Sequence, residues 1–141
     1  MASETGAKDL RPDAGIRLAR RVFTVAGWYG LVTLVPLYFL ENRVGRDFPP
    51  PITHPEHYYG FVGVALAWQV LFLIMARDPV RYRVAMIPAI LEKLSWSGAC
   101  VALYIQGRLS SVVLGTGVLD LIFAALFVAS YRATGAVRRG R

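Results

Sequence analysis

Four stretches of the chain are apolar enough, and long enough, to cross a membrane as helices. A helix needs about 20 mostly apolar residues to cross the ~30 Å hydrocarbon core. Residues 22–40 and 58–76 carry no charge, residues 84–105 are interrupted only by Glu92 and Lys93, and residues 110–131 only by Asp120. The pattern predicts an all-α integral membrane protein with one domain at 22–131 and basic tails at 1–21 and 132–141.

The basic residues predict the orientation of these spans. Twelve of the sixteen Lys and Arg residues lie in the two tails and in the loop between the second and third spans. Only Arg43, Arg46 and Arg108 lie in the other two loops, and Lys93 lies within a span. Because cytoplasmic loops are enriched in Lys and Arg, both termini are expected in the cytoplasm and the protein in the cytoplasmic (inner) membrane.

Composition narrows the class of protein. Hydrophobic residues make up 55% of the 141 residues, charged residues only 18%, and the mean hydropathy is +0.45. A soluble enzyme, a disordered chain and a coiled coil are poor fits to these values. The net charge of +7 lies mostly next to the apolar spans, where anionic lipid headgroups rather than nucleic acid are the expected partners. The single cysteine, Cys100, excludes an internal disulfide.

Each predicted span carries a polar residue near its middle. At a rise of about 1.5 Å per residue, these residues lie roughly 12–16 Å from the ends of their spans, and the bilayer centre is at about 15 Å. They are Thr33, Gln69, Glu92, Lys93 and Asp120. Ionised side chains at this depth cost about 2.5–3.5 kcal/mol each, so they need partners.

We expect the short turn at 106–109 to force the third and fourth spans into an antiparallel hairpin, which sets Lys93 and Asp120 at similar heights. The sequence predicts a Lys93–Asp120 ion pair with Glu92 nearby or protonated, and a neutral pair is an alternative. A different register for the third span, in which Lys93 extends towards the cytoplasmic surface, is a further alternative.

Helical spacing suggests which residues share a face. Glu92 and Trp96 are four apart, as are Thr116 and Asp120, and Gly63 and Ala67 form a seam of small residues that allows close helix approach. These patterns favour a compact antiparallel four-helix bundle with a polar centre. That centre is either a structural clasp or a site for a small ligand or a proton, with Trp68 and Trp96 as further candidate residues.

The loop between the first two spans contains the chain's two histidines. His54, Glu56 and His57 together could bind a transition metal, although an exposed, pH-sensitive loop is the simpler interpretation. Pro55 is expected to interrupt any helix that would align them, and Pro49–Pro51 to give a stiff, extended connection. No histidine lies within a span, which disfavours a haem held by two histidines inside the bundle. No cofactor is predicted.

Several short segments look like those of small uncharacterised bacterial membrane proteins. They include Glu41-Asn42-Arg43, His54-Pro55-Glu56, Trp68-Gln69, Arg77-Asp78-Pro79 and Leu91-Glu92-Lys93. In the number and spacing of its spans, the chain also resembles the DoxX-like group of four-helix membrane proteins. This resemblance implies an accessory membrane component of an oxidoreductase or export system, and it assigns no site residues.

Three functions are consistent with the sequence. The first is a non-enzymatic accessory or structural component that associates with other membrane proteins or with itself. The second is a ligand-binding or proton-coupled protein that uses the polar centre. The third is a lipid-phase enzyme with a carboxylate as general acid or base.

Overall fold

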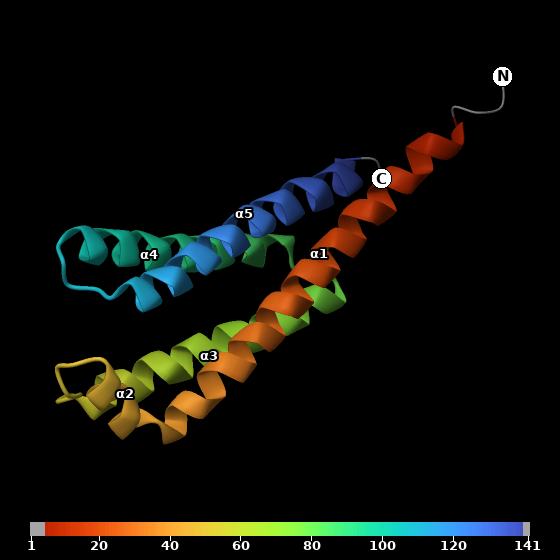
Figure 1. The fold of residues 1–141 in the computed structure, drawn as a ribbon. Coiled ribbons are helices and arrows are strands. Elements are labelled where there is room, and N and C mark those ends of the chain that lie inside the picture. The colour runs from red at the N-terminus through yellow and green to blue at the C-terminus, as the bar shows by residue number, and fades with distance from the viewer. Residues whose placement is uncertain (1–4, 140–141) are drawn as a thin grey trace. The chain divides into compact units, whose positions relative to one another are not determined.

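A computed structural model describes the backbone of residues 5–139 and the side chains of residues 14–135, and this part of the chain is helical with no strand. The elements in order are α1 (Thr5–Leu34), the 3-10 helix η1 (Val35–Phe39), α2 (Glu41–Asp47), α3 (Pro55–Arg77), the 3-10 helix η2 (Arg83–Ala85), α4 (Met86–Ile105) and α5 (Ser111–Arg139) (Figure 1). The all-α prediction is confirmed.

Four segments are long and apolar enough to cross a membrane, as predicted. They are Ala14–Phe39, Pro55–Arg77, Arg83–Ile105 and Ser111–Gly135. These segments are compatible with a multi-pass membrane protein. The helices extend beyond the apolar cores, because α1 begins at Thr5 and α5 continues to Arg139, within the regions predicted as tails. Residues 1–4 and 140–141 lie outside the described residues.

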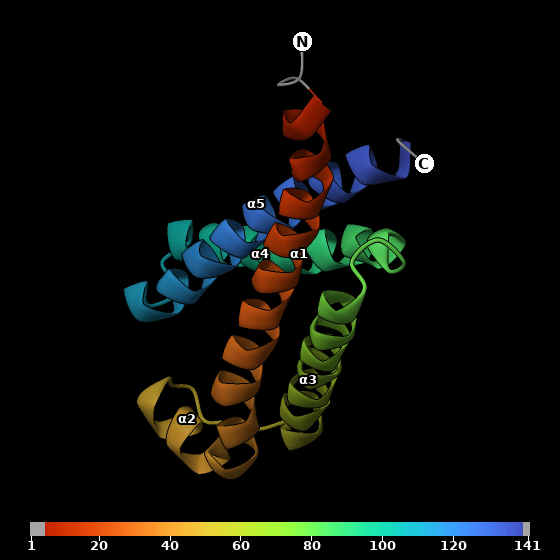
Figure 2. The ribbon, with the colours of Figure 1, turned by 90° about the vertical axis from the view of Figure 1, so that its right-hand side faces the viewer.

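The chain divides into two compact units. One contains the chain up to Phe23 and from Met75 onward, and the other contains Thr24–Ile74. In the first unit, α4 and α5 run side by side and are joined by a short turn (Figure 1). The second unit contains the end of α1, the short elements η1 and α2, and most of α3 (Figure 2).

The turn between α4 and α5 follows from its sequence. Gly107 has a φ of +68°, a left-handed conformation that glycine adopts without strain. The amides of Gly107 and Arg108 donate to the carbonyls of Tyr104 and Leu103, which is the Schellman pattern that ends a helix. Ser110 then caps α5 by accepting a hydrogen bond from the amide of Val113. The predicted tight hairpin between these helices is confirmed.

The connection between α1 and α3 differs from the predicted extended loop. Pro36 lacks an amide hydrogen, and α1 ends at Leu34 with 3-10 helix η1 following. The sequence Glu41–Asp47 forms helix α2, so only residues 48–54 remain non-helical. Pro55 is the first residue of α3, where its fixed φ and missing donor are tolerated, so His54 lies outside the helix and Glu56 and His57 lie in its first turn.

Aromatic and small residues hold α1 against α5 within the first unit. The rings of Phe23 and Phe127 stack with centroids 4.4 Å apart, and both side chains are buried. A Cβ added to Gly15 would lie 3.0 Å from the Cβ of Ala133. The contacts pair earlier residues of α1 with later residues of α5, so the two helices are antiparallel.

Arg83 of η2 packs against α5 and forms a hydrogen bond with it. Its Nε donates to the carbonyl of Tyr131 at 3.1 Å, and its guanidinium carbon lies 3.6 Å from the centroid of the Tyr131 ring. Gly135 leaves room for the guanidinium, since a Cβ there would lie 2.7 Å from Nη2. Arg83 is one of the basic residues between the second and third spans, and its contacts with Tyr131 make it a packing residue as well.

Replacing Arg83 with Lys is expected to destabilise the protein by about 1–2 kcal/mol. An ammonium lacks the planar fork that donates to the carbonyl while it covers the ring. Equilibrium unfolding in detergent measures the loss. Arg81→Lys is the matched control because Arg81 is exposed, and an equal effect of the two substitutions would contradict this role for Arg83.

Candidate functional site

The face of α4 that packs inward is set by residues three and four apart. The buried residues of α4 are Met86, Ala89, Lys93, Ser97 and Cys100. This stripe is polar at its middle and otherwise small or apolar. Trp96, which sequence analysis groups with Glu92, is on the exposed side of α4, and so is Ala99.

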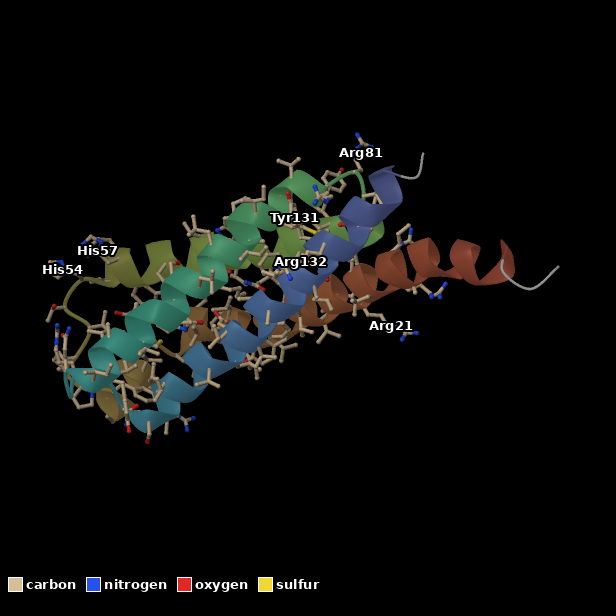
Figure 3. All side chains as sticks on the ribbon, turned by 90° about the horizontal axis from the view of Figure 1, so that it is seen from above. Arg21, His54, His57, Arg81, Tyr131 and Arg132 are labelled. Carbon is tan, nitrogen blue, oxygen red and sulfur yellow. The ribbon has the colours of Figure 1, made fainter. Side chains whose placement is uncertain are left out.

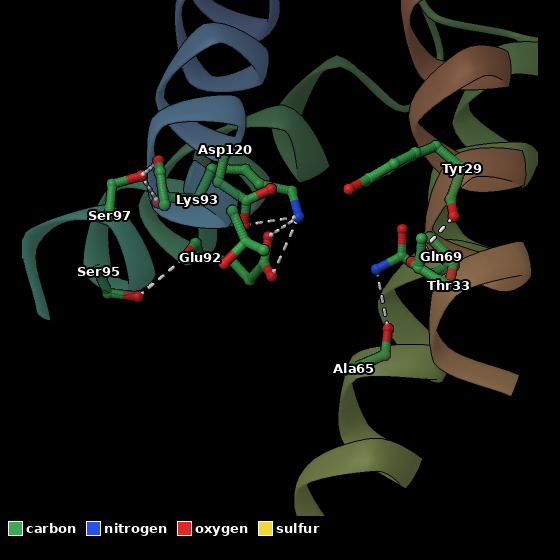
Figure 4. Close-up of polar contacts among 12 residues, drawn as sticks. Tyr29, Thr33, Ala65, Gln69, Glu92, Lys93, Ser95, Ser97 and Asp120 are labelled. Carbon is green, nitrogen blue, oxygen red and sulfur yellow. Dashed lines mark hydrogen bonds and ion pairs between the residues drawn. The ribbon is translucent and has the colours of Figure 1, made fainter. Parts of the chain in front are cut away.

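Lys93 lies between two carboxylates, and we call Glu92, Lys93 and Asp120 the Lys93 cluster. The Nζ of Lys93 is 3.3 Å from Oδ2 of Asp120, and it is 3.4 and 3.3 Å from Oε1 and Oε2 of Glu92 (Figure 4). The three side chains are only 9%, 15% and 23% exposed for Lys93, Asp120 and Glu92. The predicted Lys93–Asp120 pair, with Glu92 nearby, is therefore present between α4 and α5.

The two Glu92 oxygens differ in their contacts. Oε1 accepts a hydrogen bond from Lys93, whereas the buried Oε2 contacts the ammonium without hydrogen-bond geometry and makes no hydrogen bond within the described residues. A buried carboxylate oxygen in this state can accept a proton or a hydrogen bond from a bound group. The cluster therefore combines an ion pair with a second, less fully bonded carboxylate.

Ser97 and Gly117 bring α4 and α5 together one turn away from the cluster. The Ser97 hydroxyl lies 2.8 Å from the carbonyl oxygens of both Lys93 and Gly117. A Cβ at Gly117 would lie 2.7 Å from the Cβ of Cys100 and 3.0 Å from its Sγ. The close approach of the backbones at Gly117 allows the short Asp120 side chain to reach Lys93 from the neighbouring helix.

Gln69 occupies a tight contact in the Thr24–Ile74 unit. Its side chain is buried, and Nε2 donates to the carbonyl of Ala65 at 3.0 Å (Figure 4). The carboxamide fills the space where Gly30 has no side chain. A Cβ at Gly27 would lie 2.7 Å from the side chain of Leu73. Gly27 and Gly30 are thus the small residues through which α1 approaches α3.

The remaining candidates in this unit lie apart from that contact. Thr33 is exposed, and its hydroxyl donates within α1 to the carbonyls of Tyr29 and Gly30. Trp68 is half-buried, with its ring 6.2 Å from that of Phe72. Gly63 of the predicted small-residue seam lies near the Tyr38 hydroxyl, whereas Ala67 is exposed.

The predicted metal-binding residues lie together at the start of α3. His54, Glu56 and His57 are exposed, and one ligand atom from each lies within 4.8 Å of the others. Figure 3 shows His54 and His57 next to each other at this end of the helix. The Nδ1 of His54 is 2.9 Å from Oε1 of Glu56, and the two imidazole centroids are 5.4 Å apart. These residues form a compact group of nitrogen and oxygen ligands.

Comparison with protein families, curated proteins and solved structures finds no match to this chain.

Sequence reasoning missed the residues that bring the helices into contact. The signal for α4 was the i, i+4, i+7 series Lys93, Ser97, Cys100, which marks one helical face as clearly as the series through Glu92. On α5, Gly117 lies three residues before Asp120, which places both on the same face. A glycine on the same helical face as a buried charge, as with Gly117 and Asp120, would have identified the face of α5 that contacts α4.

Proposed function

We propose that the protein is a four-helix bundle in the cytoplasmic membrane, with both termini in the cytoplasm, and that it acts as a non-enzymatic component of a membrane assembly. Its helices associate with other membrane proteins or with further copies of the chain. The resemblance to the DoxX-like group is in line with this role.

The observation that carries the proposal is where the polar and apolar side chains lie. Only 22–28% of the apolar stretch in each of the four candidate spans is buried within the structure. Large apolar residues such as Phe61, Leu91 and Ile122 are exposed. The Lys93 cluster, by contrast, lies between α4 and α5. In water this arrangement would be unfavourable, whereas lipid tails or partner helices would cover such faces.

The short connections between the described helices also support a role in association rather than a catalytic site outside the membrane. The longest connection between helices is residues 48–54, and the other connections are shorter or contain a single helical turn. The charges in the predicted spans are in contact with one another, since Lys93 contacts both Glu92 and Asp120. We therefore assign the Lys93 cluster a structural role that fixes α4 against α5.

Single-cysteine labelling tests the orientation. In a Cys100→Ala background, Thr53→Cys is expected to react with a membrane-impermeant maleimide in intact cells, because its loop lies outside. Arg81→Cys is the matched variant, also exposed, and is expected to react only after the membrane is opened. The opposite labelling pattern would contradict termini in the cytoplasm.

Association is tested by purifying the protein in mild detergent after crosslinking in the native membrane, followed by mass spectrometry. We expect a defined partner or a self-crosslinked dimer that is lost when exposed apolar residues such as Leu91 are replaced with charged ones. A protein that stays monomeric and uncrosslinked at native expression would contradict the proposal.

A second candidate function is proton or small-ligand coupling at the Lys93 cluster. The supporting observation is that two carboxylates face one ammonium and that Glu92 Oε2 makes no hydrogen bond within the described residues. Glu92→Gln distinguishes the two functions, since it keeps the shape of the side chain. Loss of a proton flux in vesicles with folding intact would favour the second function, whereas unchanged assembly with no flux in either protein would favour the first.

A further inference from the structure

We propose that His54, Glu56 and His57 form an open binding site for a divalent transition-metal ion of the Zn²⁺ or Cu²⁺ type. The site goes beyond the proposed role in membrane assembly and does not depend on it. It uses three exposed residues whose side-chain contacts are with one another, namely the His54–Glu56 hydrogen bond and the neighbouring His54 and His57 rings.

The start of α3 brings the three ligands close together, with His54 directly before the helix and Glu56 and His57 in its first turn. The amides of His57 and Tyr58 donate to the carbonyl of His54, so the first turn of the helix forms directly on that residue. Pro55 fixes the first helical position. His54 and His57 are three residues apart, a spacing that brings side chains together on a helical surface.

The arrangement of the three ligand atoms is close to what a metal ion requires. Zn²⁺ lies about 2.0–2.2 Å from nitrogen and oxygen ligands, so ligand atoms in a tetrahedral site are roughly 3.3–3.6 Å from one another. The ligand atoms here lie within 4.8 Å of one another. All three side chains are exposed, and small rotations about their side-chain bonds would close the remaining gap.

The chemistry of the ligands selects the class of metal. Two imidazoles and one carboxylate suit Zn²⁺, Cu²⁺ and Ni²⁺ better than Mg²⁺ or Ca²⁺, which prefer oxygen ligands alone. Glu56 supplies a negative charge in the first turn of α3, which offsets the positive end of the helix dipole, where a cation is otherwise disfavoured. Three protein ligands leave at least one coordination position for water or for a ligand from another molecule.

The proposed site contains both histidines of the chain. Any metal held through imidazole must therefore use them. The protein is purified in detergent with a tag that contains no histidine, and Zn²⁺ binding is followed by isothermal titration calorimetry. The coordination of Cu²⁺ is followed by electron paramagnetic resonance.

We expect one Zn²⁺ per chain and a Cu²⁺ spectrum with nitrogen hyperfine structure. His54→Ala and His57→Ala are each expected to weaken binding at least tenfold, and Glu56→Gln to weaken it measurably.

Glu41→Gln is the matched control. Glu41 is another carboxylate of the same unit, but it accepts a hydrogen bond from Tyr59 and is not part of the ligand group. Its replacement should leave the affinity unchanged. No saturable binding to the wild-type protein, or binding that persists in the His54→Ala/His57→Ala protein, would overturn the proposal, and the helical circular dichroism of each variant verifies that it is folded.

Discussion

Replacing Lys93 with Met should lower the free energy of unfolding by about 3–5 kcal/mol, the usual loss when one partner of a buried ion pair is removed. The substitution keeps the length of the side chain but removes its charge. It leaves Glu92 and Asp120 facing each other in a buried position without the ammonium between them. Ionised carboxylates in such an environment cost about 2.5–3.5 kcal/mol each, so they must be protonated or move apart.

The other two members of the cluster should show smaller effects. Asp120→Asn leaves Lys93 paired with Glu92, and Glu92→Gln leaves it paired with Asp120. The triple variant Glu92→Gln/Lys93→Met/Asp120→Asn is expected to recover much of the stability lost in Lys93→Met, since it contains no buried charge.

Reversible unfolding in mixed detergent micelles measures these differences. Arg108→Met is the control, because Arg108 is an exposed basic residue in the turn of the same hairpin. Equal stability of the Lys93→Met and Arg108→Met proteins would show that the cluster does not hold α4 against α5.

Gly117→Val is expected to destabilise the hairpin by about 1–3 kcal/mol, the cost of inserting carbon atoms into a packed interface. The new Cβ would lie 2.7 Å from the Cβ of Cys100, and neither atom is at the end of a flexible chain. The backbones of α4 and α5 must therefore move apart, which lengthens the contact between Asp120 and Lys93.

The neighbouring glycine provides the control for this substitution. A Cβ at Gly115 meets no atom within 4 Å, so Gly115→Val introduces the same residue into the same helix without a clash. Thermal unfolding in detergent compares the two variants, and Cys100→Gly should partly restore the Gly117→Val protein. Equal melting temperatures for the two valine variants would contradict a close contact at Gly117.

The long helices could be predicted well from the sequence, because the length and apolar composition of a stretch are enough to identify a candidate membrane span. Four apolar stretches became four long helices, and the turn between α4 and α5 follows from Gly107 and Ser110. Helix α2 was missed because Glu41–Asp47 is short and polar, with Gly45 within it, and no periodic apolar face marks it. Contacts from residues outside it, such as the hydrogen bond from Tyr59 to Glu41, are not marked in the local sequence.

The candidate site was predicted in part. The height of Lys93 and Asp120 along an antiparallel hairpin was enough to predict their contact, because the turn fixes the register of the two helices. The choice of helical face was harder, since Glu92 and Lys93 are adjacent and point about 100° apart. The predicted polar layer through all four helices remains a prediction, because Gln69 and the Lys93 cluster belong to different units.

The most direct test of the central claim, that the charges of α4 and α5 satisfy one another inside the membrane, is a distance measured in lipid. Lys93 and Lys8 are the only lysines, so Lys8→Arg leaves one lysine for ¹⁵N labelling of the ammonium. Solid-state NMR in bilayers can then measure the dipolar coupling between this nitrogen and the ¹³C-labelled carboxyl groups of aspartate. We expect a measurable coupling, because Nζ of Lys93 lies 3.3 Å from Oδ2 of Asp120, and we expect it to be lost in Asp120→Asn, where this carboxyl group is absent. Absence of coupling in the folded protein would show that Lys93 and Asp120 do not meet.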